Sequence, residues 1–246
     1  VQRVITENNT ARSLELENGK TVDYDHIIST MPLTLMAERL QIMPDDLTKK
    51  VKSLTFRNTI LVYLHIDKSD LFPDQWLYIH DSEVQTGRIT NFRNWLPGLY
   101  GSNSQSILCM EYWCNFEDDL WSKDNNYMKE LASNEINHIG LAKKEDILDA
   151  EVVRIPRCYP VYFSGYREKL KPVQEFLNSI AHLHIIGRYG AYKYNNQDHS
   201  ILMGMLAAEN ILSEAKHDLW EINTDYEVYQ ESAMITKTGL TISNDN

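Results

Sequence analysis

Apolar and polar residues alternate along several stretches of the chain, and this alternation predicts strands. It is clearest from Thr55 to Ile66, a stretch rich in β-branched and aromatic residues. Near the start of the chain, Asn8-Asn9 and Asn18-Gly19 are expected to form turns between strands. The predicted strands span residues 1–6, 12–17, 22–29, 55–66, 76–80, 88–94, 107–114, 150–155 and 182–186. The central ones together indicate an antiparallel sheet.

Helices are predicted where apolar residues return at helical spacing. The longest begins at Asp124 and runs to about Ile139. Further helices are expected at 33–40, 45–51, 143–148 and 168–181, and another begins at about His199. Residues 221–246 are polar and without a pattern, so we expect a loosely packed tail there.

Composition narrows the class of protein. A chain of 246 residues can bury a substantial core in one or two compact units. No apolar run approaches ~18 residues, so no membrane span is predicted. The net charge of −11 argues against a general nucleic-acid binder or an anionic membrane partner. Three cysteines without zinc spacing, Cys109, Cys114 and Cys158, favour a reducing, cytoplasmic compartment.

Most familiar catalytic patterns are missing from the chain. The eight histidines show no His-x-x-x-His spacing and no acid-rich cluster, so no metal site is predicted. No Gly-x-Ser-x-Gly or Cys/His arrangement supports a hydrolase.

The most informative stretch runs from Gly187 to Ser200, Gly-Arg-Tyr-Gly-Ala-Tyr-Lys-Tyr-Asn-Asn-Gln-Asp-His-Ser. A short buried strand precedes it, and a helix follows that starts near Asp198, His199 and Ser200. Aspartate and serine are good helix N-cap residues. A strand, a polar turn and a helix N-terminus can hold an electron-rich ring or an anion. From the residues alone, an ordinary strand–turn–helix unit is an equally good interpretation.

This stretch resembles the C-terminal flavin-contacting motif of the UDP-galactopyranose mutase and amine-oxidase/protoporphyrinogen-oxidase-like FAD proteins. Five more segments fit that family in the same order, namely Tyr24–Leu33, Trp76–His80, Gly87–Trp95, Glu111–Cys114 and Arg157–Tyr162. The resemblance covers most of residues 1–220. The ordered set favours the mutase-like branch.

The resemblance implies an α/β (α+β) fold. Residues 1–50 and 165–220 would be the C-terminal parts of an FAD-binding domain, and residues 51–164 an inserted antiparallel-sheet substrate domain, followed by the polar tail at 221–246. The family begins with a Gly-x-Gly-x-x-Gly turn that holds the FAD pyrophosphate, and no such run occurs here. We therefore expect a C-terminal portion that lacks the N-terminal part of the FAD domain and, alone, binds FAD weakly or not at all.

The resemblance also implies which residues contact the cofactor. They are Arg188, Asp198, His199 and Ser200. A helix N-terminus beneath the flavin N1–C2=O2 edge would stabilise the reduced, anionic flavin. Asp198 would suit a ribityl hydroxyl, although a plain helix cap explains it equally well. Arg188 would lie near the flavin and the substrate phosphate, whereas without the resemblance a solvated turn arginine is the simpler interpretation.

On the substrate side, the resemblance implies that Tyr78 and Arg88 face a pyrophosphate. A guanidinium fork suits a diphosphate better than lysine does. Tyr159, Tyr194 and Asn196 match further substrate-contacting positions of the family. Trp95 stands where the mutases tend to have tyrosine, which puts one phosphate contact in doubt. With fourteen tyrosines in the chain, packing roles are the main alternative for the tyrosines.

The implied function is FAD-dependent isomerisation of a nucleotide sugar for cell-surface polysaccharide, such as lipopolysaccharide. The flavin carries the chemistry, so no catalytic side chain is expected. An oxidoreductase of the amine-oxidase or protoporphyrinogen-oxidase type is the alternative. A non-catalytic fragment without the dinucleotide-binding motif is a third possibility.

Overall fold

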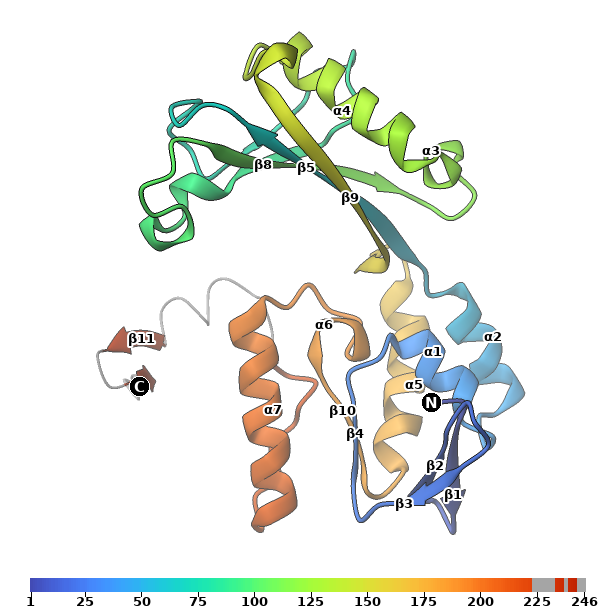
Figure 1. Ribbon diagram of the computed structural model, residues 1–246. Coiled ribbons are helices and arrows are strands. Elements are labelled where there is room, and N and C mark those ends of the chain that lie inside the picture. Colours follow the sequence, from blue (N-terminus) through green and yellow to red (C-terminus); the bar gives the residue numbers. More distant parts are fainter. Residues whose placement is uncertain (223–232, 237–238, 243–246) are drawn as a thin grey trace. The chain divides into compact units, whose positions relative to one another are not determined.

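A computed structural model describes residues 1–222, 233–236 and 239–242 (Figure 1). The fold is mixed α/β with antiparallel sheets, which confirms the predicted class. The chain divides into two compact units. Unit 1 comprises Val1–Thr55 and Tyr159–Asn246, and unit 2 comprises Phe56–Cys158.

Unit 1 combines a small antiparallel sheet, a parallel strand pair and helices. The sheet contains β1 (Arg3–Glu7), β2 (Thr10–Glu15) and β3 (Thr21–Asp23), in that order. The parallel pair consists of β4 (Ile27–Ser29) and β10 (Leu183–Ile185). The helices are α1 (Leu33–Arg39), α2 (Asp45–Ser53), α5 (Tyr166–Ser179), α6 (Gly187–Gly190) and α7 (Gln197–Leu212).

Two local features of this unit test the sequence predictions. Asn8 and Asn9 both have positive φ, 47° and 59°, as a type I′ hairpin turn requires, so the turn predicted there is confirmed. The single strand predicted over 22–29 is wrong. The chain leaves the first sheet after β3, and the Ile27 amide donates to the His182 carbonyl at 2.8 Å, so β4 pairs with a strand from far along the chain.

Unit 2 is built on one five-stranded sheet with the order β6-β7-β8-β5-β9. Its strands are β5 (Phe56–Ile66), β6 (Trp76–Tyr78), β7 (Arg88–Asn91), β8 (Ser106–Cys114) and β9 (Ile147–Pro160). Its helices are α3 (Asp119–Ser122) and α4 (Asn125–Ile139), with 3₁₀ turns η1 (Phe92–Asn94), η2 (Pro97–Leu99) and η3 (Lys144–Asp146). The pairs β5–β8, β7–β8 and β6–β7 are antiparallel.

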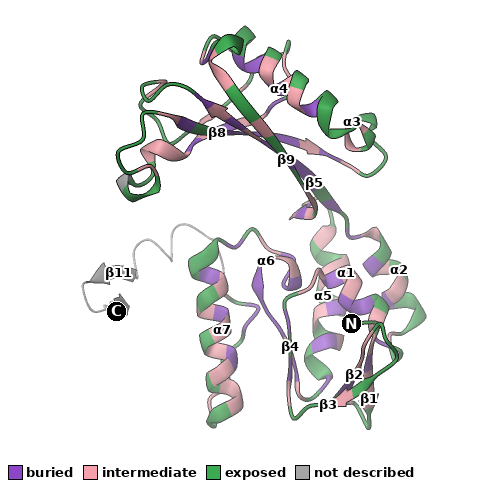
Figure 2. Cartoon of the chain, in the orientation of Figure 1, coloured by how far each residue is buried: buried purple, intermediate pink, exposed green. Residues whose placement is uncertain are grey.

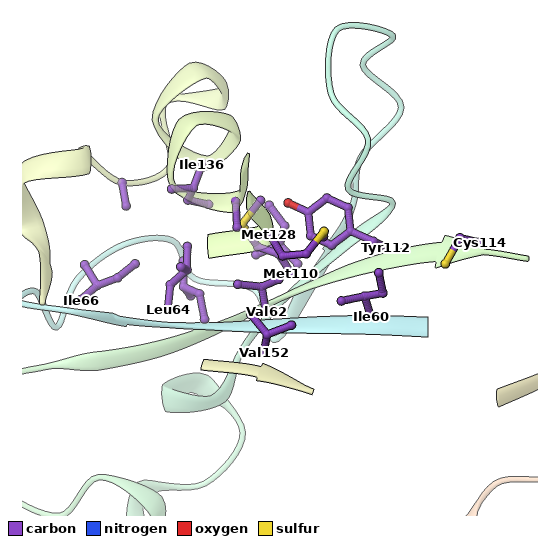
Figure 3. Packing of buried hydrophobic residues seen from close by; sticks show 14 residues of the cluster. Ile60, Val62, Leu64, Ile66, Met110, Tyr112, Cys114, Met128, Ile136 and Val152 are labelled. Atoms are coloured by element: carbon purple, nitrogen blue, oxygen red, sulfur yellow. The ribbon is translucent and has the colours of Figure 1, made fainter. Parts of the chain in front are cut away.

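The core of unit 2 lies between this sheet and α4 (Figure 3). Alternate residues of each strand share a face. Cross-strand partners on the covered face include Ile60 with Tyr112 and Val62 with Met110. From α4, the positions Met128, Ala132 and Ile136 recur every four residues and are fully buried. The residues between them on the strands point to the opposite face, where the candidate site of this unit lies.

Helix packing supplies much of the core of unit 1. Buried residues recur along one side of each helix, so that the exposed positions gather on the other side (Figure 2). Helix α5 buries Val173 and Leu177, one turn apart, and packs against α2, which buries Leu47 and Val51.

Several element boundaries differ from those predicted. The helix expected at 143–148 is wrong, because only the short 3₁₀ turn η3 forms before the chain enters β9. The strand expected at 88–94 ends at Asn91, whose side chain accepts a hydrogen bond from the Arg93 amide at 3.2 Å and starts η1. The tail predicted at 221–246 falls mostly outside the described residues, although β11 (Ala233–Thr236) and β12 (Gly239–Ile242) form an antiparallel pair there.

In the part of the chain that the structure describes, no helix combines the length and the apolar character needed to cross a membrane. The same residues contain no group of three histidine, cysteine or acidic side chains arranged to hold a metal ion.

Three histidines meet where β4 and β10 begin. His26 Nδ1 and His184 Nε2 lie 3.1 Å apart, and the ring centroids of His26 and His182 are separated by 4.5 Å. Burial lowers the pKa of His184, and the neighbouring His26 and His182 lower it further. Two neutral imidazoles can share a hydrogen bond at this distance, whereas two protonated ones repel each other.

We therefore expect acid to destabilise unit 1. Because the pKa of His184 is lower in the folded than in the unfolded chain, the unfolded chain binds more protons as pH falls below about 6.5. The contribution of neutral His184 to the stability of unit 1 is therefore complete above that pH and is lost as the pH falls below it. Urea denaturation between about pH 7.5 and pH 5.5 measures the slope, and His184→Asn should flatten it. His80→Asn, which removes an exposed histidine of unit 2, is the control and should leave the slope unchanged. An equal slope in wild type and His184→Asn would contradict the assignment.

Candidate functional site

Arg88 and Glu111 form an ion pair on the face of the unit 2 sheet opposite the core. They are cross-strand partners on β7 and β8. Arg88 Nε donates to Glu111 Oε1 at 2.7 Å, and Nη2 donates to Oε2 at 2.9 Å. Two parallel hydrogen bonds of this kind fix the guanidinium plane. The Glu111 side chain is only 8% exposed, against 27% for Arg88, so the carboxylate lies deeper in the protein than the guanidinium.

Tyr78 completes this group from the neighbouring strand. It is the cross-strand partner of Arg88 on β6, with its hydroxyl oxygen 3.5 Å from Arg88 Nη1. The Arg88 guanidinium carbon lies 5.8 Å from the centre of the Tyr78 ring, which is within range of a cation–π interaction. Tyr78 is 56% exposed. The structure thus brings together the two residues predicted to face a pyrophosphate, at a surface that an anion can reach.

Gly87, directly before β7, lets the chain approach Trp113 of β8 closely. A Cβ atom at this position would lie 2.2 Å from Cζ3 of Trp113, so only glycine fits beneath the indole. The Gly87 amide donates to the Glu111 carbonyl at 2.9 Å. Both Glu111 and Trp113 belong to the segment Glu111–Cys114 that resembles the family, but neither of them was assigned a site role from the sequence. A glutamate in the middle of an otherwise apolar strand, Leu108-Cys-Met-Glu-Tyr112, was the signal that could have identified Glu111.

The cysteine on the same face of β8, Cys109, is poorly suited to act as a nucleophile. Cys109 is buried, and burial together with the nearby Glu111 carboxylate raises the pKa of its thiol to about 12. The reactive form of cysteine is the thiolate, which is scarce at neutral pH when the pKa is this high.

Arg188, Tyr159 and Tyr194 come together in unit 1. The guanidinium carbon of Arg188 lies 4.6 Å from the centre of the Tyr159 ring and 5.3 Å from that of Tyr194. Arg188 Nη1 also donates to the Asn195 carbonyl at 2.9 Å. Arginine stacked between aromatic rings keeps its charge and loses little freedom when it binds an anion. Three residues predicted from the family motif therefore form one cluster.

Further tyrosines extend this cluster along a cavity. Tyr162 and Tyr166 stack at 4.3 Å between ring centroids, and Tyr162 meets Tyr194 edge-on at 5.0 Å. The Tyr192 hydroxyl lies 2.7 Å from the Thr55 carbonyl oxygen, and burial raises its pKa to about 12. Tyr162, Tyr166 and Tyr192 line a cavity of about 540 Å³. Most of these rings hold one another in place, which supports the packing alternative for Tyr162, Tyr166 and Tyr192.

The start of α7 differs from the prediction. Its N-cap residue is Asn196, so the expectation that Asp198 or Ser200 caps the helix is wrong. The Asn196 carbonyl accepts hydrogen bonds from the Ser200 amide at 3.2 Å and from its hydroxyl at 3.1 Å, because the helix begins almost a turn earlier. Asp198 Oδ1 lies 2.8 Å from Nδ1 of the buried His199, which ties these two neighbours together.

The residues of unit 1 fit the flavin that the resemblance implies. The carboxyl ends of parallel strands commonly hold nucleotides, and here the Ile186 amide donates to the Ser29 carbonyl at 3.0 Å just beyond β4 and β10. Ser29 Oγ and Asn195 Oδ1 are buried and have no hydrogen-bond partner among the described residues. Buried polar atoms of this kind are usually satisfied by something, and a polar ligand is one way. Ser29 and Asn195 lie in segments that resemble the family, but neither was predicted as a site residue from the sequence.

The chain belongs to the family of flavin-containing amine oxidoreductases, whose model matches residues 1–212. This confirms the resemblance noted in the sequence. The mixed α/β fold described above is consistent with membership of this flavoprotein family.

Several solved structures share the fold of the chain. It is similar to the crystal structure of a reduced UDP-galactopyranose mutase, with a TM-score of 0.76, 22% identity, and 89% of this chain and 47% of the mutase covered. A putative protoporphyrinogen oxidase from Exiguobacterium sp. 255-15 matches with a TM-score of 0.60 and 14% identity, over 76% of this chain and 41% of that one. An oxidoreductase from Methanosarcina mazei matches with a TM-score of 0.56 and 14% identity, over 85% of this chain and 48% of that one. The chain thus spans about half the length of these proteins.

Proposed function

We propose that the chain is part of an FAD-dependent, UDP-galactopyranose-mutase-like enzyme that acts on a nucleotide sugar in cell-surface polysaccharide synthesis. The observation that carries this proposal is the Arg88–Glu111–Tyr78 group. A guanidinium held in a fixed plane beside a phenol hydroxyl, at a reachable surface, suits the oxygens of a diphosphate.

In this proposal the two units have separate tasks. Residues 1–50 and 165–220 contribute to FAD binding, through Arg188, Asp198, His199 and Ser200. The sheet in 51–164 holds the diphosphate with Arg88 and Tyr78. Tyr159, Tyr194 and Asn196 contact the substrate. Of these, Tyr159 and Tyr194 contact Arg188, and Asn196 lies exposed at the start of α7.

The protein side of the mechanism is binding and electrostatics. When bound, reduced flavin supplies the nucleophile for the sugar. Arg88 neutralises charge on the departing diphosphate, which stabilises the transition state most when that charge develops. The partial positive charge at the start of α7, a helix of sixteen residues, would favour a reduced, anionic flavin. No side chain has to form a covalent bond, in keeping with the protonated Cys109 thiol.

A flavin-dependent oxidoreductase is the second candidate. The matched family is that of amine oxidoreductases, and two of the similar structures are named as an oxidase and an oxidoreductase. In such an enzyme, oxidised flavin accepts a hydride from the substrate.

Dependence on flavin reduction separates the two candidates. The complete protein should convert UDP-galactopyranose into its furanose isomer after treatment with dithionite and should do so hardly at all with oxidised flavin, because oxidised flavin is not nucleophilic. Chromatography of the nucleotide sugars measures the isomer. The same sample with oxidised flavin is the control. Absence of isomer from every UDP-sugar tried, combined with rapid oxidation of an amine or a porphyrinogen, would establish the second candidate instead.

A further inference from the structure

We propose that Glu111 is a positioning residue that aims Arg88 at the diphosphate. The proposal rests on the function proposed above and adds a role for a residue that does not itself touch the ligand. Glu111 binds one edge of the Arg88 guanidinium. Because the guanidinium is planar, this also fixes the direction of its other edge.

The hydrogen-bond pattern defines which edge faces the ligand. Arginine has five N–H donors in a planar fork. Glu111 engages the side that carries Nε and one hydrogen of Nη2. The edge formed by Nη1 and the second hydrogen of Nη2 points away from the carboxylate, and Nη1 lies 3.5 Å from the Tyr78 hydroxyl. A diphosphate oxygen pair would therefore meet a fork whose plane is already set.

The position of Glu111 in the sheet makes it a rigid support. It lies on β8, paired with Arg88 of β7 on one side and Leu61 of β5 on the other. Its backbone carbonyl accepts from the Gly87 amide at 2.9 Å and lies 3.4 Å from the Thr86 hydroxyl. Side chains on central strands hold their geometry better than those on loops.

Charge alone argues against a glutamate at this place. A carboxylate beside Arg88 cancels its charge and repels an approaching diphosphate. If charge were the only effect, replacing Glu111 with glutamine would tighten binding of an anion. If Glu111 positions Arg88, the same replacement loosens the guanidinium and weakens binding. The sign of the change separates the two effects.

The test measures UDP binding by calorimetry in the complete, FAD-loaded protein. Glu111→Gln is expected to weaken binding roughly ten- to hundredfold, because the two charge-assisted bonds that orient Arg88 are lost. Glu111→Asp keeps the negative charge, but its side chain is one methylene shorter. Its affinity for UDP should therefore lie between that of wild type and that of Glu111→Gln. Glu151→Gln makes the same chemical change at an exposed glutamate of unit 2 and should bind UDP like wild type.

A second background distinguishes positioning from a general structural role. In Arg88→Lys protein there is no guanidinium plane to orient, so only the charge effect of Glu111 remains. Adding Glu111→Gln to that variant should then leave UDP binding unchanged or tighten it. A loss of packing would instead weaken binding equally in both backgrounds, and that result would overturn the proposal.

Further outcomes separate this proposal from the proposed function. Glu111→Gln binding UDP as well as wild type, while Arg88→Ala binds poorly, would refute only the role of Glu111. Wild-type binding by Arg88→Ala would refute the diphosphate site itself. Should Glu111→Gln fail to fold, as judged by near-ultraviolet circular dichroism, Glu111→Asp decides, and UDP binding at wild-type strength or tighter in that variant would refute the positioning role.

Discussion

Glu135→Ala should lower the free energy of unfolding of unit 2 by about 3–5 kcal/mol. Glu135 on α4 is 6% exposed, and its carboxylate accepts hydrogen bonds from the Gln85 amide at 2.7 Å, the Thr86 amide at 3.2 Å and the Tyr112 hydroxyl at 2.9 Å. Removing the carboxylate leaves these donors without an acceptor in or near the core. Each buried unsatisfied donor costs about 1–3 kcal/mol.

Denaturation followed by tryptophan fluorescence measures this loss, because four of the five tryptophans belong to unit 2. Tyr112→Phe removes one donor together with its bond, so it should cost much less than Glu135→Ala. Glu130→Ala, at an exposed position of the same helix, is the control for helix propensity and surface charge and should change stability little. A Glu135→Ala protein as stable as the Glu130→Ala protein would show that the carboxylate is not an important anchor.

Arg88→Ala should weaken UDP binding by about 1.5–3 kcal/mol, the range for a hydrogen bond to a charged group. The guanidinium is the cationic partner of the proposed diphosphate, and Tyr78 alone offers one neutral hydroxyl. Flavin content should be unchanged, because the residues proposed to contact FAD belong to the other unit. Arg88→Lys should restore only part of the affinity, since an ammonium cannot reproduce the fork.

Calorimetric titration with UDP provides the measurement for these variants. Arg93→Ala is a matched control in the same unit. Arg93 stacks over Tyr100 at 3.8 Å and donates to the Asn103 carbonyl at 2.7 Å, so its loss removes a cation without touching the Arg88 group. If Arg88→Ala binds UDP as tightly as Arg93→Ala and wild type do, Arg88 is an ordinary surface arginine and the mutase proposal loses its substrate-side support.

The local pattern of apolar residues was sufficient to predict the strands and helices in which buried residues recur at regular spacing. The strand predicted at 55–66 is β5, and the helix predicted from Asp124 to Ile139 is α4, because one buries alternate residues and the other every third or fourth. The ordered motifs identified the flavoprotein family, which the family match over residues 1–212 confirms. They also named Arg88 and Tyr78 as a pair that faces a pyrophosphate, and the structure places these two residues side by side. Arg188 was predicted as a cofactor contact and Tyr159 and Tyr194 as substrate contacts, and the structure brings these three together.

Contacts between distant segments decided what pattern could not. Glu111 lies 23 residues from Arg88, and the spacing carries no sign that β7 and β8 pair in the register that joins them. Gly87 is one glycine among ten until Trp113 is seen against it. Helix α7 was expected to begin at about His199, but its N-cap residue is Asn196. Several residues in this stretch are acceptable N-cap residues, and the backbone conformation determines which of them is used. The sequence by itself therefore determined the family, the main strands and helices and the chemical types at the site. The tertiary structure decided which of those groups support one another, because that depends on strand register and close packing rather than on local periodicity.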